Sequence, residues 1–104
     1  MKIAIAAEGK DKGSKVSNVY GRSSYFLVFE DKELIKTINN PFKMGGGGAG
    51  FGVTKMLSQE KVELVVAGNF GGKVPEYLKE KNIKSKAIEN KTVGEAIKEC
   101  QDQD

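Results

Sequence analysis

Histidine is absent from this chain of 104 residues, and several other residue types that carry chemistry are scarce. There is no His, no Trp, two Pro and a single Cys, Cys100. The lack of His removes the side chain that proteins use most often as a general base and as a metal ligand. One Cys forms neither an intrachain disulfide nor a cysteine-based zinc site, and a lone thiol fits a reducing compartment. We therefore expect a cytoplasmic protein and assign no metal-ligating residues.

Long hydrophobic runs and clustered positive charge are also lacking. No apolar run approaches the roughly 20 residues that a membrane-spanning helix needs, and the sequence starts with a strand-like pattern rather than a signal peptide. The net charge is +3, from 17 basic and 14 acidic residues. The lysines are scattered, Arg22 is the only arginine, and nucleic-acid-binding domains usually cluster such residues. We expect neither a nucleic-acid nor a membrane partner.

Short apolar runs alternate with amphipathic segments, which is typical of one α/β domain over residues 1–104. Asp31-Lys32 separates two strand-like runs so closely that they predict an antiparallel hairpin. Thr92 and Glu95 match the S/T-x-x-E capping box at a helix start. Helices between the later strands predict parallel crossovers. These patterns predict a five-stranded mixed sheet with one antiparallel strand. The expected strands lie near residues 2–7, 24–30, 33–39, 63–68 and 83–88, and the expected helices near residues 53–61, 75–78 and 92–100.

The candidate site lies where the strands end, because ligands in open α/β sheets bind beyond the carboxyl ends of the strands. The first strand ends at Glu8-Gly9, the third opens into a glycine-rich stretch at residues 45–52, and the fourth opens into Gly71-Gly72. The antiparallel second strand begins at the same edge and brings Arg22 there. Lys43 joins these loops, so we expect them to form one rim.

Glycine at such a rim lets the backbone approach a ligand and direct several N–H groups at it. Each of the two glycine-rich turns precedes a helix, whose N-terminus attracts anions. Gly45, Gly47 and Gly50 formally match G-x-G-x-x-G, but the stretch follows a hairpin strand rather than the first strand of a βαβ unit. Phe51-Gly52 replaces the Lys-Ser/Thr of a P-loop. The sequence predicts an anion site; a glycine loop without a ligand is the alternative.

Other residues at the rim allow two interpretations each. The thioether of Met44 suits a soft metal or a cluster, or Met44 is simply an exposed loop residue. Phe42, Phe51 and Phe70 are core residues or an apolar wall for the ligand, and we favour packing. Cys100 falls on the apolar face of the last helix, where a free Cys acts as a small hydrophobic residue.

Arg22 is a ligand contact or a surface residue whose stem packs over Tyr20 or Tyr25. Glu8 and Asp11 could pair as carboxylates for metal-assisted hydrolysis, but an acidic pair in a lysine-rich loop is usually solvated.

The segments that carry these features together resemble the dinitrogenase iron–molybdenum cofactor biosynthesis domain family. The resemblance extends over nearly the whole chain. It rests on MKIAIAAEG, VSNVYGRSSYFLVFE, the Asn-Pro pair after the hairpin, GGGGAGFGVTKML, VELVVAGNFGGKVPEYL and TVGEAI.

This resemblance implies a three-layer α/β/α, ribonuclease-H-like fold without nuclease carboxylates, and a role in cofactor biosynthesis linked to nitrogen fixation. Family members are carriers or chaperones that hold an anionic iron–sulfur or molybdenum-containing cluster, or its precursor, and pass it from donor to acceptor proteins. Many have His two residues before the Gly-Arg pair, where this chain has Val19. Without that imidazole, hydrogen bonds and charge are the means left for capturing the cluster. The expected cofactor-binding residues are Gly21, Arg22, Lys43, Met44, Gly46, Gly47, Gly48, Gly50, Gly71 and Gly72.

Two functions follow. The first is a non-catalytic binder of a metal–sulfur cluster or another anionic cofactor. The second is a small enzyme or enzyme subunit that binds a phosphate or a nucleotide at the same rim, against which the lack of His and of a nucleophile–base pair argues. A glycine loop that serves only as an interaction module is a third interpretation.

Overall fold

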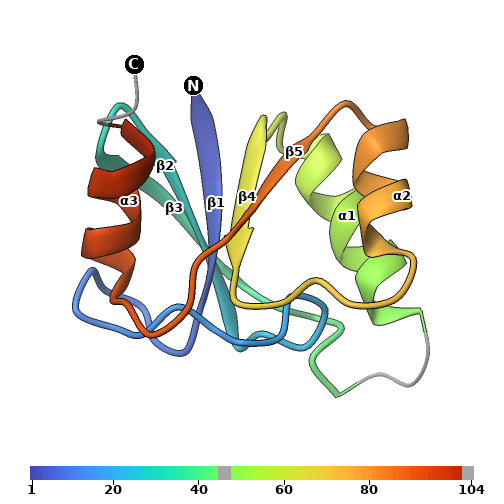
Figure 1. Cartoon of the computed structure of the whole chain (residues 1–104), viewed down its shortest axis with the longest axis horizontal. Helices are drawn as coiled ribbons and strands as arrows, with labels where there is room; N and C mark the ends of the chain where they lie inside the picture. The colour runs from blue at the N-terminus through green and yellow to red at the C-terminus, as the bar shows by residue number, and fades with distance from the viewer. Residues whose placement is uncertain (45–47, 102–104) are drawn as a thin grey trace.

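A computed structural model describes residues 1–44 and 48–101 of the chain, and within them the strands and helices follow one another in the predicted order (Figure 1). None of the helices in these residues is long and apolar enough to cross a membrane. The elements are β1 (Lys2–Ala7), β2 (Tyr25–Glu30), β3 (Glu33–Asn39), α1 (Ala49–Gln59), β4 (Leu64–Ala67), α2 (Val74–Glu80), β5 (Lys84–Ala87) and α3 (Val93–Gln101).

The five strands form one sheet in the order β3-β2-β1-β4-β5. β2 pairs antiparallel with both of its neighbours, whereas β1 pairs parallel with β4 and β4 parallel with β5. The predicted mixed sheet with one antiparallel strand is confirmed. β1 lies in the centre, where Ile3 is in register with Phe29 on one side and Leu64 on the other. Its near-continuous apolar run reflects a strand that is covered on both faces.

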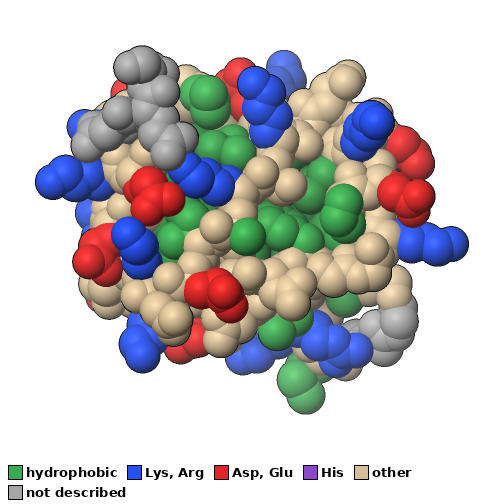
Figure 2. All heavy atoms as spheres, viewed as in Figure 1, with side chains coloured by type: hydrophobic (Ala, Val, Ile, Leu, Met, Phe, Trp, Pro, Cys, Tyr) green, Lys and Arg blue, Asp and Glu red, His purple; other side chains and the backbone are tan. Residues whose placement is uncertain are grey.

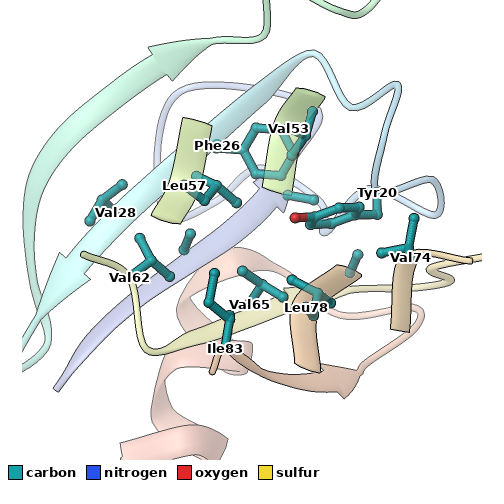
Figure 3. Close-up of a cluster of buried hydrophobic side chains, with 13 residues drawn as sticks. Tyr20, Phe26, Val28, Val53, Leu57, Val62, Val65, Val74, Leu78 and Ile83 are labelled. Atoms are coloured by element: carbon teal, nitrogen blue, oxygen red, sulfur yellow. The ribbon is translucent and has the colours of Figure 1, made fainter. Parts of the chain in front are cut away.

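Helices cover both faces of the sheet, which gives the expected three layers: α3 lies on one side, and α1 and α2 lie together on the other (Figure 1). Side chains alternate along β1, so Ala4 and Ala6 belong to the core under α1 and α2, and Ile3 and Ile5 to the core under α3. The first core contains Tyr20 among apolar residues of the sheet and of both helices (Figure 3).

α1 starts earlier than the sequence predicts, at Ala49 rather than near Val53. Gly50 and Gly52, expected in a loop, therefore lie in the first turns of this helix. The prediction was wrong because glycine disfavours helix interiors, whereas here it makes room for neighbours. A Cβ at Gly50 would lie 2.4 Å from Cγ2 of Val74, and one at Gly52 would lie 2.5 Å from the ring of Phe42.

The predicted capping box at the start of α3 is confirmed. The backbone N–H of Glu95 donates to Oγ1 of Thr92 over 3.2 Å, and the backbone N–H of Thr92 donates to Oε1 of Glu95 over 2.8 Å. These reciprocal bonds satisfy backbone donors that have no partner within the helix. Hydrogen bonds from the backbone and side chain of Thr92 lower the pKa of Glu95.

We predict that Thr92→Ala lowers the free energy of unfolding by about 1 kcal/mol, as expected for the loss of an N-cap side chain. Because the pKa of Glu95 is lowered from 4.5 in the folded state, its contribution to stability is present above that value and is lost as the pH falls through the lowered pKa. The difference between Thr92→Ala and the wild type, measured by urea unfolding, should therefore shrink in acid. Glu95→Gln keeps an acceptor oxygen and should cost less. Equal stability of Thr92→Ala and wild type at pH 7 would contradict the prediction.

Candidate functional site at the loop edge of the sheet

One edge of the sheet collects the loops that the sequence singled out. Ala7 at the end of β1 is in register with Tyr25 at the start of β2, which is in register with Asn39 at the end of β3. β4 runs parallel to β1 and ends at Ala67, beside the same loops. The connection between β1 and β2 crosses this edge, and we call its residues 17–24 the strap.

Asn40 fastens the strap to the segment that follows β3. Its side-chain amide donates to the carbonyl of Gly21 over 3.0 Å and to that of Ser23 over 2.9 Å. Its Oδ1 accepts the backbone N–H of Phe42 over 2.9 Å. This buried amide thus holds two loops together with three hydrogen bonds. The Asn-Pro pair was interpreted only as the end of a hairpin, although Asn often hydrogen-bonds to the backbone two residues further on.

The strap is also hydrogen-bonded to the loop after β4. The backbone N–H of Gly68 donates to the carbonyl of Ser17 over 2.8 Å, and that of Tyr20 donates to the carbonyl of Asn69 over 3.1 Å. The ring of Tyr20 packs on Phe70 with a centroid separation of 5.2 Å. The strap therefore contacts the loops after both β3 and β4.

The strap reaches α1 at a glycine pair. A Cβ built on Gly21 would lie 3.0 Å from the backbone N and 3.3 Å from Cα of Gly50. Two backbones come this close only where side chains are missing. Because Arg22 follows Gly21 directly, this contact brings the only arginine of the chain to the N-terminus of α1. Arg22 is exposed, and within the described residues it forms no ion pair.

The N-terminus of α1 suits an anion. Gly48 precedes the helix with φ of 92°, makes no side-chain cap, and the first turn contains no acidic residue. Gly52 donates to the carbonyl of Gly48 over 3.0 Å, but no acceptor among the described residues reaches the N–H groups of Ala49, Gly50 or Phe51. Donors of this kind at the start of a helix, together with the helix dipole, favour negative charge at this point.

Gly71 and Gly72 lie in the loop between β4 and α2 with φ of 65° and 44°, a conformation that favours glycine. A Cβ on either residue would meet nothing within 4 Å, so both face open space. The N–H of Gly71 is already used, since it donates to Oδ1 of Asn69 over 2.9 Å. α2, which follows them, is short and begins with Pro75 in its first turn.

The remaining candidates differ in how closely they approach this edge. Lys43 is exposed and Met44 is 90% exposed, and both lie in the turn that Asn40 fastens. The predicted site residues Gly46 and Gly47 lie outside the described residues. Sequence reasoning missed Asn18, Val19 and Asn69, which line an open hollow of about 180 Å³ together with Phe70 and Gly71.

The three phenylalanines near the edge divide between packing and exposure. Phe42 and Phe70 pack against the core under α1 and α2, as favoured from the sequence. Phe51 is 53% exposed and meets Tyr77 edge to face at a centroid separation of 5.3 Å. Phe51 also borders the hollow of about 400 Å³ that begins at Gly48, so an apolar surface adjoins the helix N-terminus.

Asp11 and Cys100, the other residues considered for chemistry, take part in local structure and packing. Oδ1 of Asp11 accepts the backbone N–H of Gly13 over 2.9 Å and the hydroxyl of Ser14 over 3.2 Å, which closes a turn. Cys100 is half-buried and packs on the core under α3, and burial raises the pKa of its thiol. No group of three or more acidic, His or Cys side chains that could hold a metal ion occurs in residues 1–44 and 48–101.

Charge on the surface is dispersed. Figure 2 shows Lys and Arg side chains distributed around the face in view, several of them beside Asp or Glu side chains. This pattern agrees with the scattered lysines of the sequence.

The geometry defines a small α/β domain that gathers backbone amides and the cationic residues Arg22 and Lys43 at one edge of its sheet. Residues 1–103 match the family described as dinitrogenase iron-molybdenum cofactor. The chain belongs to this family, as the resemblance of its segments implied.

Two solved structures are similar to almost the whole chain. The orange protein of Desulfovibrio gigas, determined in its apo form, is 25% identical; the match covers 97% of this chain and 87% of that protein, with a TM-score of 0.91. The Thermotoga protein TM1290, a NifB candidate assigned to the DUF35 family, is 30% identical, with 98% and 88% covered and a TM-score of 0.81. No curated protein matches the sequence.

The contact between Gly21 and Gly50 gives a stability prediction. Gly21→Ala should lower the free energy of unfolding by about 1–3 kcal/mol, the usual cost of overpacking, because the new Cβ meets backbone atoms that cannot rotate away. The control is Gly94→Ala in α3, where a Cβ would meet nothing closer than 3.4 Å. That substitution should be neutral or stabilise the protein by up to about 1 kcal/mol. Urea unfolding of both variants tests the contact, and equal stabilities would rule it out.

Proposed function

We propose that this protein is a non-catalytic carrier that holds an anionic metal–sulfur cluster at the loop edge of its sheet. The observation that carries the proposal is the contact of Gly21 with Gly50, because it joins Arg22 to an uncapped helix N-terminus that has no acidic residue in its first turn. Three backbone N–H groups that meet no acceptor among the described residues then lie close to the residue that carries the guanidinium. Each of these groups favours negative charge.

The available donors fit a cluster that is bound through its outer atoms. The sequence contains no His, and the described residues offer no metal-ligating group of three. Backbone N–H groups and Arg22 can instead donate hydrogen bonds to sulfide or oxo atoms at the surface of a cluster. Binding of this kind leaves the metal coordination intact. A carrier that must release its cargo gains from such a mode, because release then breaks no bond to a metal.

Met44 and Lys43 extend this surface. Lys43 adds a second cation in the turn that Asn40 fastens to the strap, and Met44 offers a polarisable thioether with 90% of its surface exposed. Gly48, Gly50, Gly71 and Gly72 contribute backbone without side chains, and Gly46 and Gly47 complete the proposed set. The cargo is an iron–sulfur or molybdenum-containing cluster, or its precursor, received from a donor protein and passed to an acceptor protein.

The family and the similar proteins support this proposal. The family is described by the iron-molybdenum cofactor of dinitrogenase, and the orange protein was determined in an apo form, a term that presupposes a ligand. The chemistry of the chain favours a carrier over an enzyme. Without His, and with the pKa of Tyr20 raised to about 12 by burial, neither an imidazole nor this phenol serves for proton transfer near neutral pH.

We predict that the protein, purified and kept without oxygen, binds tetrathiomolybdate and that Arg22→Ala weakens this binding about tenfold at low salt. Loss of one charge-assisted hydrogen bond corresponds to an effect of this size. High salt should reduce the difference, since it screens an exposed cation. Isothermal titration gives the Kd, and elemental analysis gives the molybdenum bound per chain.

The matched control is Lys84→Ala, which also removes one positive charge. Lys84 is the first residue of β5, so it lies at the end of the strands opposite the loop edge. This variant should bind like the wild type. Inorganic phosphate and ATP form the comparison arm. Binding of ATP in preference to tetrathiomolybdate would favour the alternative of a nucleotide-binding enzyme or enzyme subunit. Absence of binding to either class, or equal loss in the Arg22 and Lys84 variants, would refute the proposed site.

A further inference from the structure

Tyr20 is fully buried, and its hydroxyl lies inside an otherwise apolar core (Figure 3). The ring packs edge to face on Phe26, at a centroid separation of 5.7 Å, and on Phe70. Its hydroxyl oxygen lies 3.0 Å from Oγ1 of Thr54, which is 1% exposed. A phenylalanine would supply the same ring contacts without a buried polar atom, so packing alone gives no reason for the hydroxyl.

The direction of the hydrogen bonds follows from the single hydrogen on each hydroxyl. Thr54 donates its hydrogen to the backbone carbonyl of Gly50 over 2.8 Å. Tyr20 must therefore be the donor to Thr54. Burial raises the pKa of Tyr20 to about 12, so this donor keeps its proton across the physiological range.

The two hydroxyls end at the same helical turn that the strap contacts. Tyr20 is bonded to Thr54, and Thr54 is bonded to Gly50, one turn earlier in α1. Gly21, the neighbour of Tyr20, packs directly on Gly50. Strap and helix are thus joined twice, once by backbone contact at the surface and once by hydroxyls in the core. Two separate attachments fix the rotation of the first turn as well as its distance.

We infer that Tyr20 and Thr54 are positioning residues for the anion site: their hydroxyls orient the first turn of α1, so that its backbone N–H groups face the same region as Arg22. Neither side chain contacts the ligand. Tyr20 also holds the loop after β4 through its backbone N–H, so it links that loop and α1 to the strap. The inference rests on the proposed function for the identity of the ligand, but its structural part is testable without one.

The experiment compares Tyr20→Phe and Thr54→Val, which remove one hydroxyl each, with Thr54→Ser, which keeps it. Ile97→Val is the control for lost stability, because Ile97 lies in the core on the other face of the sheet. The first readout is the Kd for tetrathiomolybdate. We expect it to rise about three- to tenfold in Tyr20→Phe and Thr54→Val, the usual range for one hydrogen bond. Thr54→Ser and Ile97→Val should keep the wild-type value.

The second readout is amide hydrogen exchange in the ligand-free protein. The N–H groups of residues 52–54 should exchange faster in Tyr20→Phe than in Ile97→Val once the two are compared at equal global stability. A purely structural role predicts equal exchange and an unchanged Kd, and either result would overturn the inference. If the wild type binds no tetrathiomolybdate, the proposed function fails, while faster exchange at residues 52–54 would still support the positioning role.

Discussion

The close approach of Gly21 to Gly50 is the constraint on which the loop edge depends. Once these two backbones touch, the strap crosses the end of β1, Asn40 can reach the carbonyls of Gly21 and Ser23, and Tyr20 can place its hydroxyl beside Thr54. Each attachment is modest in energy, since a typical hydrogen bond contributes about 1 kcal/mol net. Their value lies in acting on the same few residues, so that loops from different parts of the sheet move as one body.

Most of the fold could be predicted from local patterns. Apolar runs, the two-residue break at Asp31-Lys32 and the Thr92–Glu95 box act over a few residues, and they predict the strand order in sequence, the hairpin and the start of α3. The glycines could not be assigned this way. Gly50 and Gly52 are glycines because Val74 and Phe42, distant in the sequence, leave no room for a Cβ there. Local patterns therefore suggested a loop where the chain forms a helix. The ribonuclease-H-like relationship stays a prediction.

The gathering of these loops at one edge could be predicted from the sequence, but the contacts that join them could not. The rule that ligands bind at the carboxyl ends of strands located the edge, and Arg22, Lys43 and Met44 do lie along its loops. Asn40, Tyr20 and Thr54 were missed as parts of it because their role is to hold backbone, and hydrogen bonds over 17 to 34 residues leave no spacing in the sequence. Whether Gly21, Arg22 and the glycines bind a cluster stays a proposal. Membership of the family is the reason for proposing a metal-containing cofactor as the ligand.

The two ends of the described chain and the candidate site lie at opposite ends of the strands. β1 begins at the edge opposite the loops, and the described part of α3 ends at that opposite edge, near the marked N-terminus (Figure 1). Any protein fused ahead of β1 would therefore start from the rear of the domain, and the same holds for a fusion after α3. A purification tag, a surface tether or a fusion partner at either position therefore leaves the loop edge exposed.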